Sequence, residues 1–158
     1  MQNWRKINND PVCFGTKDDT YGTFVMTENG LIYTFKLVHK TGSLSCKPIH
    51  PASYWGCTHP WFQGHELLTV ITYPNKTALQ LADYLRDGRK CGMLYHAYHI
   101  DGVGVDSTEL VFNNLSPPMS VSIGQMFQIW YGEDLHDCYE GDNSGQTCAD
   151  VYAWYATD

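Results

Sequence analysis

Apolar and polar residues alternate along much of this chain, and this alternation limits the fold more than any other feature of the sequence. In residues 31–38, which read Leu-Ile-Tyr-Thr-Phe-Lys-Leu-Val, the first, third, fifth and seventh side chains would share one face of an extended strand. A second strand-like segment, 22–26, precedes this one, and Asn29-Gly30 lies between them. Because Asn-Gly between two such segments is a strong turn signal, the sequence predicts a β-hairpin here.

Several further segments are rich in β-branched and aromatic residues, which favour strands. Only the segment 77–86 has leucines near helical spacing, with Thr77 or Asn75 available as a cap. Short strands separated by turns that contain Gly and Pro predict a mostly β fold, either an antiparallel β-sandwich or an irregular barrel, with at most one short helix. The further expected strands are 67–73, 93–100, 109–112, 119–123, 125–131 and 149–155.

The length and charge of the chain exclude several classes of protein. With 158 residues, we expect one domain spanning residues 1–158. The formal net charge of −7 disfavours nucleic acid as a partner, because binding to phosphates needs clustered Lys and Arg. No apolar run approaches the roughly twenty residues of a membrane helix, so we expect no membrane insertion. The polar residues 1–9 lack the apolar centre of a signal peptide, so a secreted form would have lost its signal.

Six cysteines indicate an oxidising, extracellular compartment, because their number is even and none has the Cys-x-x-Cys spacing of zinc and redox sites. Sequons at Asn75-Lys76-Thr77 and Asn114-Leu115-Ser116 agree with secretion, although Pro117 disfavours use of the second. Six cysteines allow fifteen pairings, and one cysteine can also link two subunits. Among the pairings we favour Cys138 with Cys148, which would stiffen the turn between them.

An acidic, glycine-containing segment near the end of the chain is the strongest candidate for a binding site. Oxygen ligands on a bent loop suit a hard cation such as Ca²⁺, which takes about 6–8 oxygens in flexible geometry. The positions match no register of an EF-hand loop. The alternative is an ordinary solvated turn whose acids point apart into water. The acidic and amide residues of the segment are Glu133, Asp134, Asp137, Glu140, Asp142, Asn143 and Asp150.

Five Trp and eleven Tyr suit a carbohydrate site, where a ring packs on the apolar face of a sugar. Trp130 and Tyr131 directly precede the acidic segment, although most aromatic residues of a β protein belong to its core.

Catalysis is less well supported. The chain has no Gly-x-Ser-x-Gly elbow, its histidines lack zinc-site spacing, and a glycosidase needs carboxyls across a cleft rather than grouped on one turn. We therefore expect no enzyme.

Three separated blocks of the sequence resemble a known family. They are 11–15 (Pro-Val-Cys-Phe-Gly) with 21–24 (Tyr-Gly-Thr-Phe), then 34–39 (Thr-Phe-Lys-Leu-Val-His), and last 130–135 (Trp-Tyr-Gly-Glu-Asp-Leu) with 142–145 (Asp-Asn-Ser-Gly) and 148–152 (Cys-Ala-Asp-Val-Tyr). Over nearly its whole length the chain resembles the small galactose-binding lectins of sea anemones of the AJLec type, and related modules of cnidarian extracellular and skeletal-matrix proteins. The resemblance implies a β-rich, secreted, calcium-dependent homodimeric lectin for glycans with terminal β-linked galactose, such as lactose-like glycans.

Carried onto this sequence, the resemblance gives the acidic segment the role of a calcium site. Oxygen chemistry selects Glu133, Asp134, Asp142, Asn143 and Asp150 as its ligands. Open positions on the ion would accept the adjacent 3- and 4-hydroxyls of galactose. The alternative is a structural matrix or mineral-associated protein in which calcium only stabilises the fold. In the lectin interpretation, the side chains expected to orient the sugar or cover its apolar face are Trp130, Tyr131, His136, Ser144 and Gln146.

Overall fold

The computed structural model describes residues 4–62, 65–82, 97–137 and 140–156, and every pairing between the strands in these ranges is antiparallel. Two sheets contain most of the described strands, and their inward side chains contribute to one apolar core. A pair of short strands and two single-turn helices complete this part of the chain. The predicted mostly β, antiparallel architecture is confirmed, and the described strands form open sheets rather than a closed barrel.

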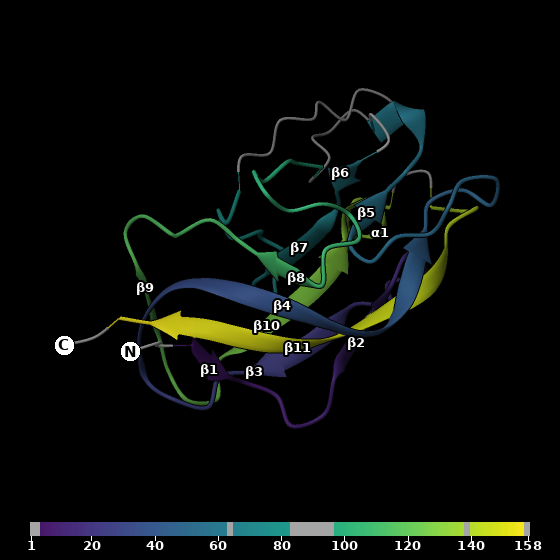
Figure 1. The fold of residues 1–158 in the computed structure, drawn as a ribbon. Coiled ribbons are helices and arrows are strands. Elements are labelled where there is room, and N and C mark those ends of the chain that lie inside the picture. Colours follow the sequence, from purple (N-terminus) through teal and green to yellow (C-terminus); the bar gives the residue numbers. More distant parts are fainter. Residues whose placement is uncertain (1–3, 63–64, 83–96, 138–139, 157–158) are drawn as a thin grey trace.

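The larger sheet is built around two long strands, β4 (Gly30–Ser45) and β11 (Ser144–Tyr155). Figure 1 shows them side by side, in blue and yellow, and they pair along nearly the whole length of β11. The other strands of this sheet are β1 (Trp4–Lys6) and β2 (Val12–Gly15), which pair with β11, and β8 (Glu109–Val111) and β9 (Met119–Val121), which pair with β4.

The smaller sheet has the order β3, β10, β7, and its central strand, β10, leads directly into the candidate site described below. Phe24, Phe35 and Phe127, from β3, β4 and β10, contact one another with ring centroids 5.3 to 5.6 Å apart. These rings join the two sheets. The elements not yet placed are β3 (Gly22–Val25), β10 (Met126–Tyr131), β7 (Thr69–Thr72), β5 (Gly56–Cys57), β6 (Glu66–Leu67), the 3₁₀ turn η1 (Pro60–Phe62) and α1 (Gly132–Leu135).

The hairpin predicted around Asn29-Gly30 is wrong. β3 pairs with β10, whereas β4 pairs with β11, so the two strands lie in different sheets. Phe24 and Phe35 meet across the core, and the chain between them crosses from one sheet to the other. The Asn29 side chain instead stabilises the chain around Ile123, because its Oδ1 accepts a hydrogen bond from the backbone N of Ile123 over 2.8 Å.

The predicted alternation along β4 holds only in part. Phe35 and Leu37 are buried as expected, but Ile32 is also buried and Leu31 is 49% exposed. The register of β4 against β11 shifts just before the last residue of β11. A β-bulge of this kind adds one residue to one strand, and it thereby reverses which side chains face the core.

The other predicted elements differ mainly in their bounds. The segment 149–155 belongs to β11, which begins earlier, at Ser144. Residues 77–82 of the predicted helix form no helix, because Ala78 makes a β-bridge to Thr72 of β7. The rest of that prediction, and residues 93–96 of the predicted strand 93–100, lie outside the described residues. No helix in the described ranges is long and apolar enough to cross a membrane.

Two disulfides join the cysteines of the described residues, Cys13 with Cys148 and Cys46 with Cys57. The predicted pairing of Cys138 with Cys148 is therefore wrong. Cys13 and Cys148 lie directly opposite each other on β2 and β11, so strand pairing, and not closeness in sequence, selects this bridge. Cys91 and Cys138 lie outside the described residues.

Candidate functional site

The short helix α1 places two carboxylates at the end of β10. Glu133 and Asp134 lie in its first turn, and both are buried, with 5% and 1% of their surfaces exposed. Buried carboxylates need hydrogen-bond donors or cations, because transfer of a charge out of water is costly. The contacts of these two residues therefore define what the site can do.

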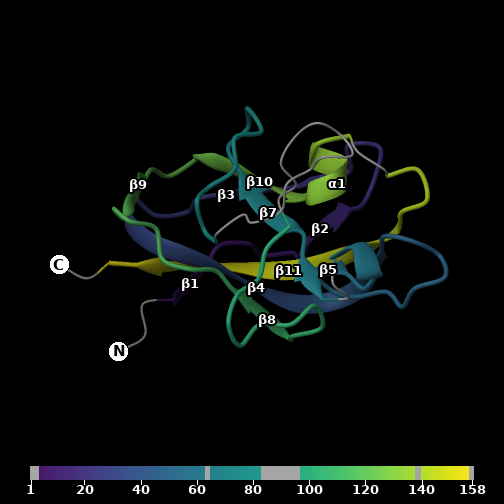
Figure 2. The same ribbon diagram turned by 90° about the horizontal axis from the view of Figure 1, so that it is seen from above.

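Asp134 binds the loop that connects β2 to β3. Its Oδ1 accepts a hydrogen bond from the backbone N of Asp19 at 2.9 Å, and its Oδ2 accepts one from the backbone N of Thr20 at 3.1 Å. Asp18 and Asp19 have φ angles of 62° and 57°, a region in which residues other than glycine are uncommon. The Asp134 carboxylate thus stabilises a strained loop and fixes it beside α1. Figure 2 shows this loop, in dark purple, next to the helix.

Asn143 connects this loop and α1 to the start of β11. Its Nδ2 donates to Oε1 of Glu133 over 3.1 Å and to the backbone oxygen of Thr16 over 3.2 Å. Its backbone N donates to the backbone oxygen of Glu140 over 2.9 Å. The Asn143 side chain is 1% exposed, so these contacts form away from water. One amide therefore joins the loop after β2, the short helix α1 and the start of β11.

Several side-chain oxygens around Asn143 are buried and accept no hydrogen bond. They are Oδ1 of Asn143, Oε2 of Glu140 and Oγ1 of Thr16. Buried polar atoms without partners are rare in folded proteins and often indicate an ion or a water at that place. Carboxylate, amide and hydroxyl oxygens are the ligands that Ca²⁺ prefers, so these residues fit such an ion chemically.

The electrostatics of the cluster also favour a cation. Burial raises the pKa of Glu133 to about 8, with a smaller increase from the Asp142 carboxylate, while the hydrogen bond from Asn143 opposes the shift. Burial likewise raises the pKa of Glu140 to about 8, and its contacts with Asp134 and Asp137 add to the effect. Carboxyl groups crowded in this way stay protonated near neutral pH unless a bound cation takes the place of the protons.

The cluster is not assembled as a set of metal ligands. Within the ranges that the structure describes, no three His, Cys, Asp or Glu side chains are arranged as ligands of one ion. Asp134 directs its carboxylate at the loop, and part of the oxygen supply comes from Asn143 and Thr16, which are other residue types. To bind a cation, the cluster would also need the carboxylates of the half-buried Glu140 and the exposed Asp142 as ligands.

A small pocket lies beside the cluster. Its volume is about 200 Å³, and it is lined by Ser144 and Gln146 of β11, by residues 15–18 and by Thr20. Gly145 between them has a φ of 91°, and a Cβ there would lie 2.3 Å from the backbone oxygen of Ser43. Only glycine fits this close approach of β11 to β4.

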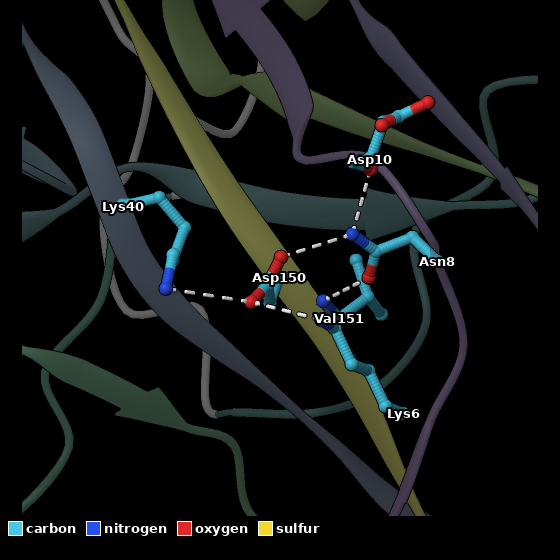
Figure 3. A network of polar contacts seen from close by, with 6 residues as sticks. All are labelled: Lys6, Asn8, Asp10, Lys40, Asp150 and Val151. Carbon is cyan, nitrogen blue, oxygen red and sulfur yellow. Dashed lines mark hydrogen bonds and ion pairs between the residues drawn. The ribbon is translucent and has the colours of Figure 1, made fainter.

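The structure does not bring Asp150 to this cluster. Asp150 lies seven residues after Asn143, roughly 23 Å further along an extended chain. Figure 3 shows Lys6 and Lys40 on either side of its carboxylate, with Nζ to Oδ2 distances of 3.5 and 3.8 Å, and Asn8 donating to Oδ1 over 3.1 Å. Two lysines and one amide already compensate this charge, so Asp150 belongs to the packing of β1 and β4 on β11.

The aromatic residues expected to cover a sugar are also placed differently. Trp130 and Tyr131 are 0% exposed, so both belong to the core. The Trp130 ring stacks on Tyr21, with ring centroids 4.6 Å apart and planes 26° apart, and Tyr21 is 40% exposed. Tyr21 directly follows the loop that Asp134 holds. His136 follows α1, is half-buried, and has its pKa lowered by burial.

Sequence reasoning gave too little weight to three residues of this site. Glu140 belongs to the acidic segment, and its carboxylate alone could have marked it as a candidate ligand. Tyr21 belongs to a block that resembles the lectin family, yet nothing in the sequence relates it to Trp130. Thr16 carries no signal, because only the fold brings it to Asn143.

Comparison with known proteins gives one similar structure. The chain matches no model of a known protein family and no curated protein sequence. The solved structure of AJLec from the sea anemone Anthopleura japonica superposes on this chain with a TM-score of 0.83. The two sequences are 30% identical, and the match covers 98% of each chain.

Proposed function

The chain belongs to the family of sea-anemone lectins that AJLec represents, and from this premise we propose that it is a secreted, calcium-dependent lectin for glycans that end in β-linked galactose. It acts as a binding protein and not as an enzyme. The two disulfides support an oxidising, extracellular compartment. A homodimer would present two sites at once, and two weak sites together raise the avidity for a surface that carries many glycans.

One observation supports the proposal most strongly: the buried oxygens around Asn143 that accept no hydrogen bond. A calcium ion would be held by Oδ1 of Asn143 and by the carboxylates of Glu133 and Glu140, with Asp142 from the adjacent turn. Asp134 would contribute mainly by holding the loop 16–20, since both its oxygens already accept hydrogen bonds there. Asp150 is left out of this ligand set because lysines surround it.

The sugar would bind in the pocket next to the cluster. A bound Ca²⁺ supplies open coordination positions to two adjacent sugar hydroxyls. Ser144 and Gln146 can donate hydrogen bonds to further hydroxyls and so fix the orientation of the ring. Galactose is distinguished from glucose by its axial 4-hydroxyl, which gives the 3,4-pair a different angle. Tyr21 does not line this pocket, but it directly follows Thr20, which does, and its ring is the exposed aromatic surface adjacent to the pocket in sequence.

Affinity chromatography tests this function. The chain should be retained on immobilised galactose in the presence of Ca²⁺, elute with a chelator, and bind again when Ca²⁺ is restored. Immobilised glucose is the matched control and should retain much less protein. Retention that persists in chelator would contradict the calcium mechanism, and equal retention on both columns would contradict the galactose specificity.

The burial of Glu133 and Asn143 favours a second candidate, a matrix protein in which calcium only stabilises the fold. Ligands that are 5% and 1% exposed leave little open surface for a sugar. In that case Ca²⁺ would raise the unfolding temperature, as any ligand of the native state does, and no sugar would raise it further. A further increase with galactose, seen only in Ca²⁺, would favour the lectin.

A further inference from the structure

The sequon Asn75-Lys76-Thr77 forms an exposed turn at the end of β7. The backbone N of Tyr73 donates to the oxygen of Thr77, and the backbone N of Lys76 donates to the oxygen of Tyr73, both over 2.9 Å. These two hydrogen bonds close the turn. Residues 74–77 are all exposed, so the turn has room for a bulky group outside the core.

The side chain of Asn75 is held in a defined orientation within this turn. Its Oδ1 accepts a hydrogen bond from the backbone N of Thr77 over 3.0 Å, an Asx turn. Its Nδ2 is engaged by no hydrogen bond to another described residue. Lys76, with a φ of 72°, places its Nζ 4.9 Å from the centroid of the Trp130 ring, which anchors the turn to β10.

The second sequon, Asn114-Leu115-Ser116, lies in a different environment. The backbone N of Leu115 donates to the oxygen of Tyr33 on β4 over 2.6 Å, and the Leu115 side chain packs against the core. Pro117 follows the sequon directly, and a proline restricts the backbone of the residue before it. This sequon is tied to the larger sheet, whereas the first one forms a separate turn.

We propose that Asn75 is the N-glycosylation site of the secreted protein and that Asn114 remains unmodified. The donor would be an oligosaccharide linked to a lipid diphosphate, the substrate class of the secretory glycosyltransferase. A bond forms between Nδ2 of Asn75 and the anomeric carbon of the first sugar, while the bond from that carbon to the diphosphate oxygen breaks. The lipid diphosphate leaves with the electron pair, and the amide nitrogen gives one proton to a base of the transferase.

Secretion of the whole chain from cultured eukaryotic cells, with a signal peptide added, tests the proposal. The secreted protein should lose the mass of one glycan on treatment with peptide-N-glycosidase, and peptide mapping should then find aspartate in place of Asn75. Asn75→Gln and Thr77→Ala should each abolish the mass loss. Thr77→Ser, which keeps a hydroxyl in the sequon, and Asn114→Gln should both retain it.

Two results would overturn the proposal: a secreted wild-type protein without a glycan, or a glycan attached to Asn114 in place of Asn75. Peptide mapping of the wild-type protein decides between these outcomes even where a variant is not secreted. The proposal does not depend on the calcium site, because galactose binding and glycosylation are measured separately.

Discussion

Asn143 donates its side-chain Nδ2 to Oε1 of Glu133 over 3.1 Å, and this contact joins the start of β11 to α1. Asn143→Ala removes that bond, the bond to Thr16, and the Oδ1 proposed to hold calcium. We expect chelator-sensitive retention on immobilised galactose to be lost. The free energy of unfolding should fall by about 1–3 kcal/mol, because buried partners lose their donor. Urea denaturation measures the second effect.

The matched control for Asn143 is Asn114→Ala, which changes an exposed asparagine of the same chain. Column retention and stability should stay at the wild-type level in this control. Full galactose binding by a folded Asn143→Ala protein would place the sugar site elsewhere.

The raised pKa of Glu133 predicts how stability depends on pH in the absence of calcium. Burial raises this pKa from 4.5 to about 8, so the folded chain keeps a proton that the unfolded chain releases. Stability from this group is therefore present below pH 4.5 and is lost as the pH rises through about 8. Thermal unfolding in chelator should show a lower midpoint at the alkaline end of this range.

Calcium and Glu133→Gln should each weaken that pH dependence, for different reasons. A bound cation compensates the ionised carboxylate, and glutamine does not titrate in this range. Glu28→Gln, which alters an exposed carboxylate paired with Arg5, is the control and should leave the dependence intact. A midpoint in chelator that rises with pH would contradict the assigned role of Glu133.

Much of the fold could be predicted from the sequence, because alternation along a strand is a local property. It located most of the strands, and the aromatic and β-branched composition made the β class clear. The partner of each strand is not a local property. Asn29-Gly30 gave a turn signal, but the contact of Phe24 with Phe35 across the core places their strands in different sheets. The pairing of Cys13 with Cys148 depends on strand register in the same way.

The candidate site was predictable in composition but not in the role of each residue. Glu133 and Asn143 lie in one acidic segment, whose composition suited a cation but equally an ordinary solvated turn, and only the family resemblance favoured the cation. The partners of Asp134 are 114 and 115 residues away in sequence, so its role in holding a loop could not be read from its neighbours. Asp150 is an aspartate like Asp134, yet it lies far along the extended strand β11, where it contacts Lys6 and Lys40.

Asp134→Ala tests whether the loop 16–20 depends on one carboxylate. The backbone N atoms of Asp19 and Thr20 would lose their acceptor, and the positive φ angle of Asp19 would lose its support. We expect faster amide hydrogen exchange at these two residues and a loss of galactose binding. Asp101→Ala, at an exposed position, should change neither measurement. Unchanged exchange at both amides would show that other contacts hold the loop.

Tyr21 is predicted to cover the apolar face of the bound sugar, because its ring is 40% exposed while Trp130 beneath it is buried. An aromatic contact of this kind contributes about 0.5–1.5 kcal/mol, so Tyr21→Ala should weaken galactose binding by about 2- to 12-fold. Tyr21→Phe keeps the ring and its stacking on Trp130, and it should bind nearly as well as the wild type. Titration calorimetry in Ca²⁺ measures both affinities. Equal affinity of the Ala and Phe variants would mean that the sugar does not touch this ring.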